Sequence, residues 1–176
     1  KKGAFFAREA GAKAAWGEII IQADADTVYP SDWLRRITGH FHDHPEAVAV
    51  AGVFIYQNPP WWAGIELFFR NLFNLIAVFL FSRPFIISGA NLAFYRWAFE
   101  GVGGYNTETY SSDQYDIASR LSILGRVIYD GKIKVRTSSR TVERKPVYII
   151  FCDFCQHLWR FGKLNAALSS GGVKPL

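Results

Sequence analysis

A short run of isoleucines that leads into two carboxylates restricts the fold of this chain more than any other feature. The run Ile19-Ile20-Ile21 is followed, after two residues, by Asp24-Ala25-Asp26-Thr27. A short, continuously apolar run predicts a buried strand of a parallel sheet, and open α/β sheets bind ligands outside the carboxyl ends of their strands. Because residues i and i+2 of an extended chain project to the same side, we expect Asp24 and Asp26 to converge on one ligand.

The carboxylate pair predicts a divalent metal site. Two adjacent carboxylates repel each other unless a cation compensates their charge, and hard oxygen ligands beside phosphate favour Mg²⁺ or Mn²⁺. Two other interpretations stay open. One is an Asp-rich turn whose side chains bond the local backbone. The other is the D-x-D-x-[TV] nucleophile motif of the haloacid dehalogenase superfamily over Asp24–Val28, although the later acidic pair of that superfamily has no match here.

A second acidic cluster, Ser111–Asp116, precedes the apolar positions of a predicted helix. Ser111 and Gln114 match a capping box, which places Asp113 in the first helical turn, where the helix dipole favours a carboxylate. An ionised aspartate in a cleft can accept the proton of an attacking hydroxyl. Asp113 is therefore a candidate general base, and the alternative is that the cluster only begins and solvates a helix.

Helical and strand-like segments alternate along the chain, which predicts an α/β fold with helices flanking a mixed, mainly parallel sheet. The expected helices cover residues 5–15, 30–45, 96–100, 113–124 and 147–161. The expected strands cover residues 18–23, 47–56, 127–129 and 133–135. Asp130-Gly131 is a hairpin signal that should join the last two strands.

The basic charge is concentrated in one segment. The formal net charge is +5, and residues 120–145 hold eight Lys and Arg against two acids. This excess predicts an anionic partner, either a diphosphate or an anionic membrane face. Binding of nucleic acid has no supporting motif, so we expect no nucleic-acid partner.

An aromatic stretch over Trp61–Ile87 is interrupted by polar residues, and its longest clean part, Leu75–Phe81, is too short to span a bilayer. We expect an interfacial helix or a lip over a pocket, with core packing as the alternative. Cys152 and Cys155 form a C-x-x-C inside an apolar helical run, which favours two buried, reduced thiols and a reducing cytoplasm over redox chemistry. His40 and His44 share a helix face that could bind zinc, but a solvated helix end fits them better.

Three segments, taken together and in order, resemble the inverting family-2 glycosyltransferases of GT-A fold. These segments are Ala7-Arg8-Glu9-Ala10-Gly11 with Ala14–Ile20, Asp24–Thr27 and Trp33-Leu34; Gly89-Ala90-Asn91-Leu92-Ala93 with Phe99–Tyr105; and Ser112–Asp116 with Arg120-Leu121. They span residues 7–121, about two thirds of the chain. Their joint spacing is more specific than any one of them.

The resemblance implies a nucleotide-diphosphate sugar donor, Mn²⁺ or Mg²⁺, and a saccharide or lipid-linked acceptor. Asp26 would bind the metal and the diphosphate, and Asp24 the ribose or the metal shell. Asp113 would be the base of a single, inverting displacement. Arg8, Gly89, Asn91 and Arg140 would complete the nucleotide-sugar site. Other classes left open are a non-catalytic membrane-associated fragment or binding module, and the phosphatase or phosphotransferase.

Two residues depart from the family pattern, namely Glu9 in place of Asn and Ser112 in place of Glu. The family's opening strand has no counterpart before Lys1, so we expect an N-terminally truncated GT-A domain over residues 1–145 and a C-terminal amphipathic helix and tail over residues 146–176. An unpaired sheet edge would favour association. We expect a cytoplasmic protein in peripheral contact with the inner face of the membrane.

Overall fold

The computed structural model describes residues 4–105, 113–144 and 147–169. Its elements in chain order are α1 (Ala4–Ala14), β1 (Ile19–Gln22), β2 (Thr27–Val28), α2 (Trp33–Asp43), β3 (Ala47–Gln57), α3 (Ala63–Phe81), η1 (Gly89–Asn91), β4 (Leu92–Tyr95), α4 (Arg96–Gly101), α5 (Asp113–Leu124), β5 (Arg126–Ser138), α6 (Arg140–Arg144) and α7 (Val147–Ser169). The predicted helices are all confirmed, and so are the strands expected at residues 18–23 and 47–56.

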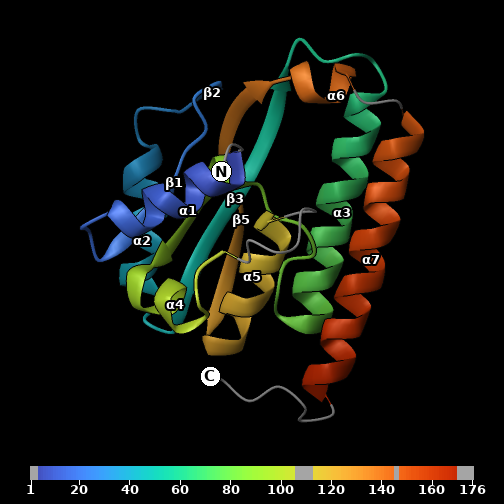
Figure 1. Cartoon of the computed structure of the whole chain (residues 1–176). Helices are drawn as coiled ribbons and strands as arrows, with labels where there is room; N and C mark the ends of the chain where they lie inside the picture. Colours follow the sequence, from blue (N-terminus) through green and yellow to red (C-terminus); the bar gives the residue numbers. More distant parts are fainter. Residues whose placement is uncertain (1–3, 106–112, 145–146, 170–176) are drawn as a thin grey trace.

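The strands form one twisted sheet in the order β1-β4-β3-β5-β2 (Figure 1). β1, β3 and β5 run in the same direction, so their carboxyl ends share one edge of the sheet. The predicted mixed α/β sheet with flanking helices is confirmed. The sheet was expected to be mainly parallel, but in the part of the chain described only β3 and β5 pair in parallel. The reason is that β4 lies antiparallel between β1 and β3.

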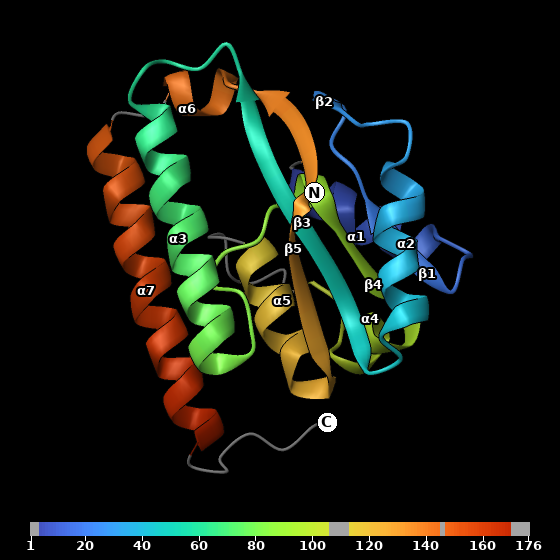
Figure 2. The ribbon, with the colours of Figure 1, turned by 180° about the vertical axis from the view of Figure 1, so that it is seen from behind.

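Helices cover both faces of the sheet. α2 packs on one face (Figure 2), where its helical spacing buries Trp33, Ile37 and Phe41. α1, α4 and α5 contribute to the core on the other face, with Ala12, Phe99, Ile117 and Leu121. β1, which leads into the carboxylate pair, contributes Ile20 to one of these apolar layers and Ile19 and Ile21 to the other.

β5 is one strand, so the predicted hairpin at Asp130-Gly131 is wrong. Gly52 of β3 pairs with Asp130 and Val53 pairs with Lys134, which leaves residues 131–133 bulged out of the ladder. Asp130 holds the bulge, because its Oδ1 accepts a hydrogen bond from the Lys132 amide at 2.8 Å and its Oδ2 lies 2.9 Å from His40 Nε2. Burial raises the pKa of Asp130, but these bonds outweigh it and leave that pKa below its usual range.

The two histidines weighed as zinc ligands pair with different acids. His40 lies against Asp130, and His44 Nδ1 lies 3.6 Å from Glu46 Oε1. They lie in and just after the last turn of α2, as the helix-end interpretation expects, but both side chains are partly buried rather than fully solvated.

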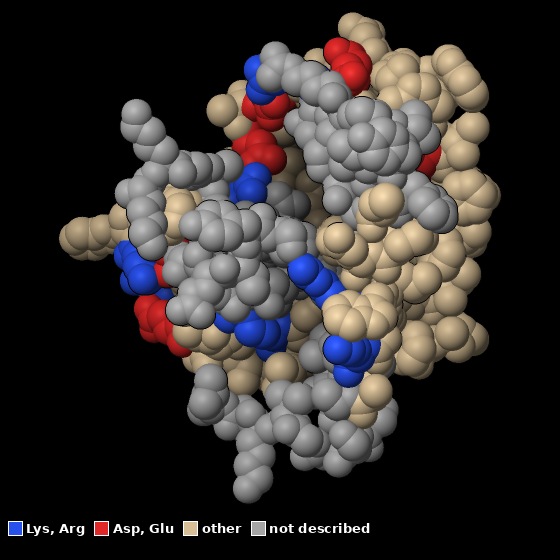
Figure 3. Space-filling model, turned by 45° about the vertical axis from the view of Figure 1, so that its right-hand side comes forward, with Lys and Arg blue, Asp and Glu red and all other residues tan. Residues whose placement is uncertain are grey.

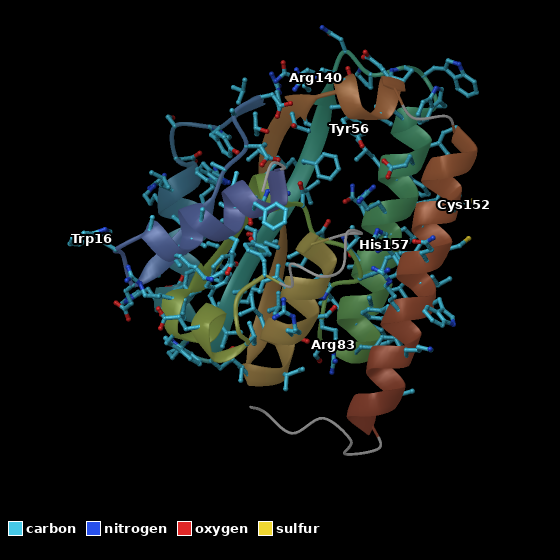
Figure 4. All side chains as sticks on the ribbon, viewed as in Figure 1. Trp16, Tyr56, Arg83, Arg140, Cys152 and His157 are labelled. Atoms are coloured by element: carbon cyan, nitrogen blue, oxygen red, sulfur yellow. The ribbon has the colours of Figure 1, made fainter. Side chains whose placement is uncertain are left out.

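α3 and α7 lie side by side at one flank of the molecule in both ribbon views (Figures 1 and 2). Phe73, Phe85, Phe154 and Phe161 join them in a small aromatic cluster. Cys152 and Cys155 are free and exposed, so the expectation of buried thiols is wrong (Figure 4). In Figure 4 the Cys152 side chain points outward from α7.

α3 is one continuous helix of 19 residues, whereas the longest part of this stretch free of polar interruptions in the sequence is Leu75–Phe81. Among the described residues, it is the one helix whose length and composition would let it cross a membrane, with a mean hydropathy of 1.6. Only 11% of that window is buried inside the protein. The alternative that this stretch is ordinary core is therefore wrong for most of α3.

Candidate functional site

Four segments meet at the carboxyl edge of the sheet. Asp24–Asp26 follows β1, Gly89–Asn91 precedes β4, and Ser138–Arg140 lies at the end of β5. The register joins them, because Gln22 lies opposite Leu92 and Thr27 lies opposite Thr137. The end of β3 completes the edge, since Gln57 pairs with Ser138.

Each carboxylate of the pair is bonded to an arginine from a distant part of the chain. Arg8 of α1 donates to Asp24 Oδ1 at 3.0 Å, and both side chains are partly buried. Arg140 donates to Asp26 Oδ2 at 2.9 Å, in a more exposed pair (Figure 4 labels Arg140). The structure thus brings together four of the predicted site residues, and the arginines compensate the repulsion that two neighbouring carboxylates would otherwise feel.

Tyr29, which the sequence gave no reason to select, fixes the carboxylate loop. Its hydroxyl accepts a hydrogen bond from the Asp24 amide at 2.8 Å and donates one to the Ala90 carbonyl at 2.9 Å. Burial raises the pKa of Tyr29, and the nearby Asp24 and Asp26 carboxylates raise it further. The phenol therefore keeps its proton at neutral pH and ties the loop after β1 to the loop before β4.

β2 anchors the second carboxylate. Thr27 Oγ1 and Thr137 Oγ1 are 3.0 Å apart, and the Ser138 amide donates to the Asp26 carbonyl at 3.2 Å. These contacts place Asp26 directly beside the start of α6 and Arg140. The backbone around Asp26 is therefore held by β5, whereas its side chain stays half-exposed.

Asn91 is fully buried, and its side-chain amide bonds other groups of the protein interior. Nδ2 donates to the Val53 carbonyl at 3.0 Å and to the Ile133 carbonyl at 2.9 Å. Oδ1 accepts from Trp33 Nε1 at 2.8 Å. Asn91 therefore supports the site from below, and direct contact of Asn91 or of the buried Gly89 with a nucleotide sugar stays a prediction.

Asp113 begins α5, as the sequence predicted. Its side chain, like residues 106–112 before it, lies outside the described part of the structure. α5 itself is firmly placed, because Ile117 and Leu121 are completely buried. Convergence of the Asp113 carboxylate on Asp24 and Asp26 stays a prediction.

Glu9, where the family pattern has Asn, anchors the turn that leads toward Asp113. Its Oε2 accepts from the Tyr105 amide at 2.8 Å, and its Oε1 pairs with Lys13 at 2.7 Å. The Tyr105 hydroxyl in turn bonds Gln22 Oε1 at the end of β1. Adjacent residues of α1, Arg8 and Glu9, thus hold the carboxylate loop and this turn.

Gly104 has no room for a side chain beneath Glu9. Its φ is +72°, and a Cβ would lie 2.9 Å and 3.0 Å from the two carboxylate oxygens of Glu9. Gly103 has a similar φ of +76° but open space around it. We expect Gly104→Ala to destabilise the protein by about 1–2 kcal/mol more than Gly103→Ala, because the two share the backbone penalty and only the former meets Glu9. Urea unfolding measures the difference, and equal midpoints would contradict the close packing.

The donor set at this edge fits a divalent cation that also binds phosphate. The described residues hold no group of three or more His, Cys, Asp or Glu side chains suited to a metal. Mg²⁺-type sites are commonly built from one or two carboxylates together with substrate phosphates. Asp24 and Asp26 would be the carboxylates of such a site.

A family model named "Glycosyl transferase family group 2" matches residues 19–146, which is most of the chain. The chain belongs to glycosyltransferase family group 2. The match includes Asp24–Val28, so the D-x-D-x-[TV] pattern lies within a glycosyltransferase-family segment. The resemblance read from residues 7–121 is confirmed at the level of the family.

Two comparisons place this family-2 chain among known proteins. It is 30% identical over 172 residues to the glucosyl-dolichyl phosphate glucuronosyltransferase of Haloferax volcanii, over 88% of this chain and 54% of the relative. Its fold is similar to that of a mannosyltransferase from Pyrobaculum calidifontis solved in complex with GDP-Man and Mn²⁺. That likeness has a TM-score of 0.64 at 18% identity, over 99% of this chain and 57% of the other. The GT-A fold is thereby confirmed, and the chain spans just over half the length of each.

Proposed function

We propose that this chain carries donor-binding and catalytic residues of a metal-dependent, inverting glycosyltransferase. The enzyme would move a hexosyl group from a nucleotide-diphosphate sugar to an acceptor hydroxyl. The observation that carries the proposal is the pair of carboxylates, Asp24 and Asp26, each bonded to an arginine at the carboxyl edge of the sheet. Membership of a glycosyltransferase family supports sugar transfer as the reaction at this site.

Asp26 and Asp24 would hold a Mn²⁺ or Mg²⁺ ion. That ion, when bound, supplies positive charge that stabilises a leaving diphosphate. Arg140 is exposed, and one nitrogen of its guanidinium donates to Asp26. When a donor binds, the same planar guanidinium could release Asp26 and bond a diphosphate oxygen instead. Arg8 is more buried and would keep Asp24 oriented while the donor binds.

Asp113 would act as the general base. As the acceptor hydroxyl attacks the anomeric carbon, its proton passes to the Asp113 carboxylate. The bond from the anomeric carbon to the diphosphate oxygen breaks in the same step, and the electron pair leaves with the diphosphate. One displacement from the opposite side inverts the anomeric centre.

We propose a lipid-linked acceptor and a place at the inner face of the membrane. The Haloferax relative is named for a dolichyl phosphate-linked glucose, which supports an acceptor of this class. The exposed, free Cys152 and Cys155 agree with a reducing compartment. The competing hypothesis is a binding module without catalysis, which predicts no donor binding at all.

Calorimetry tests donor binding directly. We expect GDP-mannose, UDP-glucose or UDP-glucuronate to give binding heat in the presence of Mn²⁺, and EDTA to remove it. Asp26→Asn should weaken the Mn²⁺-dependent affinity by about tenfold or more, because one anionic metal ligand is lost. Asp43→Asn is the matched control, since Asp43 is exposed at the end of α2. Absence of heat with all three donors would favour the binding module.

A further inference from the structure

The polar side chains of α3 face the protein. Glu66, Arg70 and Asn74 recur every four residues, so they form one stripe along the helix. Glu66 and Arg70 are paired with each other, and both side chains are partly buried. Asn74 bonds both the amide and the carbonyl of Ile86 at 2.7 Å.

The same stripe is tied to the sheet. The Arg70 guanidinium lies over the Phe54 ring of β3, 5.4 Å from its centroid. Asn71, beside the stripe, accepts a hydrogen bond from the Tyr129 hydroxyl of β5 at 2.9 Å. Burial, with Glu66 nearby, raises the pKa of Tyr56 to about 12. The side of α3 that faces the sheet is therefore a polar, hydrogen-bonded contact, while Phe73 packs in the aromatic cluster shared with α7.

The outward side of α3 is apolar along its whole length, which reverses the usual polarity of a surface helix. Its side chains are 37% to 85% exposed. We call these side chains the outer face of α3: Ile65, Phe68, Phe69, Leu72, Leu75, Ile76, Phe79, Leu80 and Phe81. A continuous exposed apolar area of this kind marks a site that another apolar phase covers.

α7 extends this surface. Leu158 and Trp159 are 45% and 61% exposed, and Lys163 Nζ lies 3.8 Å above the Trp159 ring. In Figure 3 the flank that carries α3 and α7 is largely tan, with few charged side chains. The described side chains of α3 and α7 include no exposed acid, whereas Lys163 is an exposed cation, which complements anionic lipid headgroups.

We propose that the outer face of α3, together with the exposed side chains of α7, lies in the interface of an anionic bilayer with the α3 axis parallel to the membrane plane. A helix of 19 residues is about 28 Å long, yet a spanning orientation would pull its polar stripe away from β3 and β5. Protein interfaces combine apolar area with hydrogen bonds and a polar rim. The outer face of α3 has the apolar area but no hydrogen-bonding groups and no polar rim. A lipid surface therefore fits it better than a second copy of the chain does.

The orientation also bears on the acceptor, and this step rests on the proposed function. α3 begins at Ala63, shortly after β3 ends at Gln57 on the edge that carries Asp24 and Asp26. One end of the membrane surface is therefore close to the candidate site. A hydroxyl on a lipid-linked saccharide would reach that edge from the bilayer.

Flotation with extruded vesicles of phosphatidylcholine and phosphatidylglycerol tests the surface. Leu75 of α3 is 66% exposed and Leu34 of α2 is 55% exposed, so the same Leu→Glu change can be made at both. We expect Leu75→Glu to lower vesicle partitioning by about tenfold or more. Leu34→Glu should stay within about twofold of the unchanged protein.

Three results would overturn the proposal. Leu75→Glu could float like the unchanged protein, or Leu34→Glu could lose flotation equally. Sedimentation velocity could instead reveal a dimer that Leu75→Glu dissociates while vesicles bind neither form, which would assign the face to self-association. Circular dichroism confirms folding of both variants. Donor calorimetry in solution, which Leu75→Glu should leave unchanged, separates failure here from failure of the proposed function.

Discussion

Replacement of Asp113 by asparagine is expected to slow sugar transfer by about 10²–10⁴-fold while donor binding is retained. The amide fills the same volume but cannot accept the proton of the acceptor hydroxyl. α5 begins at Asp113 and is anchored by the buried Ile117 and Leu121, so the substitution should leave the fold in place. The N-terminus of a helix also favours an ionised carboxylate, which a general base requires.

The control for Asp113→Asn is Asp43→Asn, which makes the same chemical change at an exposed residue at the end of α2. Transfer rates should be compared across pH, because loss of a general base also removes the acidic limb of the kcat/KM profile. A rate within about threefold of the unchanged enzyme would show that another group takes the proton. Loss of donor binding would instead assign Asp113 to the donor site.

The sequence predicts local elements well where the apolar pattern is clear. α2 follows Pro30 and has buried residues at helical spacing, β1 is a short apolar run, and β3 is a longer strand of 11 residues. The hairpin predicted at Asp130-Gly131 was wrong because a turn signal is local. The register of β5 is set instead by its pairing with β3 on both sides of the bulge. A hairpin motif and a bulge can therefore share the same residues.

At the candidate site, the position of two carboxylates after an apolar run pointed to Asp24 and Asp26, and the resemblance to the family-2 glycosyltransferases added Arg8 and Arg140. They could not reveal the direction of a side chain. Asn91 lies in a motif shared with the family, but only the tertiary structure places its amide in the core. In α3, the spacing of Glu66, Arg70 and Asn74 was visible, yet only the packing shows that this polar side faces inward.

Gly52→Ala is expected to destabilise the protein by at least about 3 kcal/mol. A Cβ at Gly52 would lie 2.2 Å from Asn91 Nδ2 and 2.3 Å from the Ile133 carbonyl oxygen. Asn91 cannot withdraw, because it bonds Val53, Ile133 and Trp33 at once. The bulge in β5, the strand β3 and the loop before β4 are therefore locked together at one glycine.

Gly39→Ala provides a control of opposite sign. Gly39 lies inside α2 with nothing within 4 Å of an added Cβ, so alanine there should stabilise the protein by about 0.5–1 kcal/mol.

Asn91→Ala should itself cost about 3–5 kcal/mol, since it leaves two carbonyls and the Trp33 N–H without this partner. Because Asn91→Ala also removes the nearest obstacle to a Cβ at Gly52, the double variant should lose less stability than the two single losses combined. Urea unfolding of all four variants measures this coupling, and strict additivity would mean that Gly52 and Asn91 act independently.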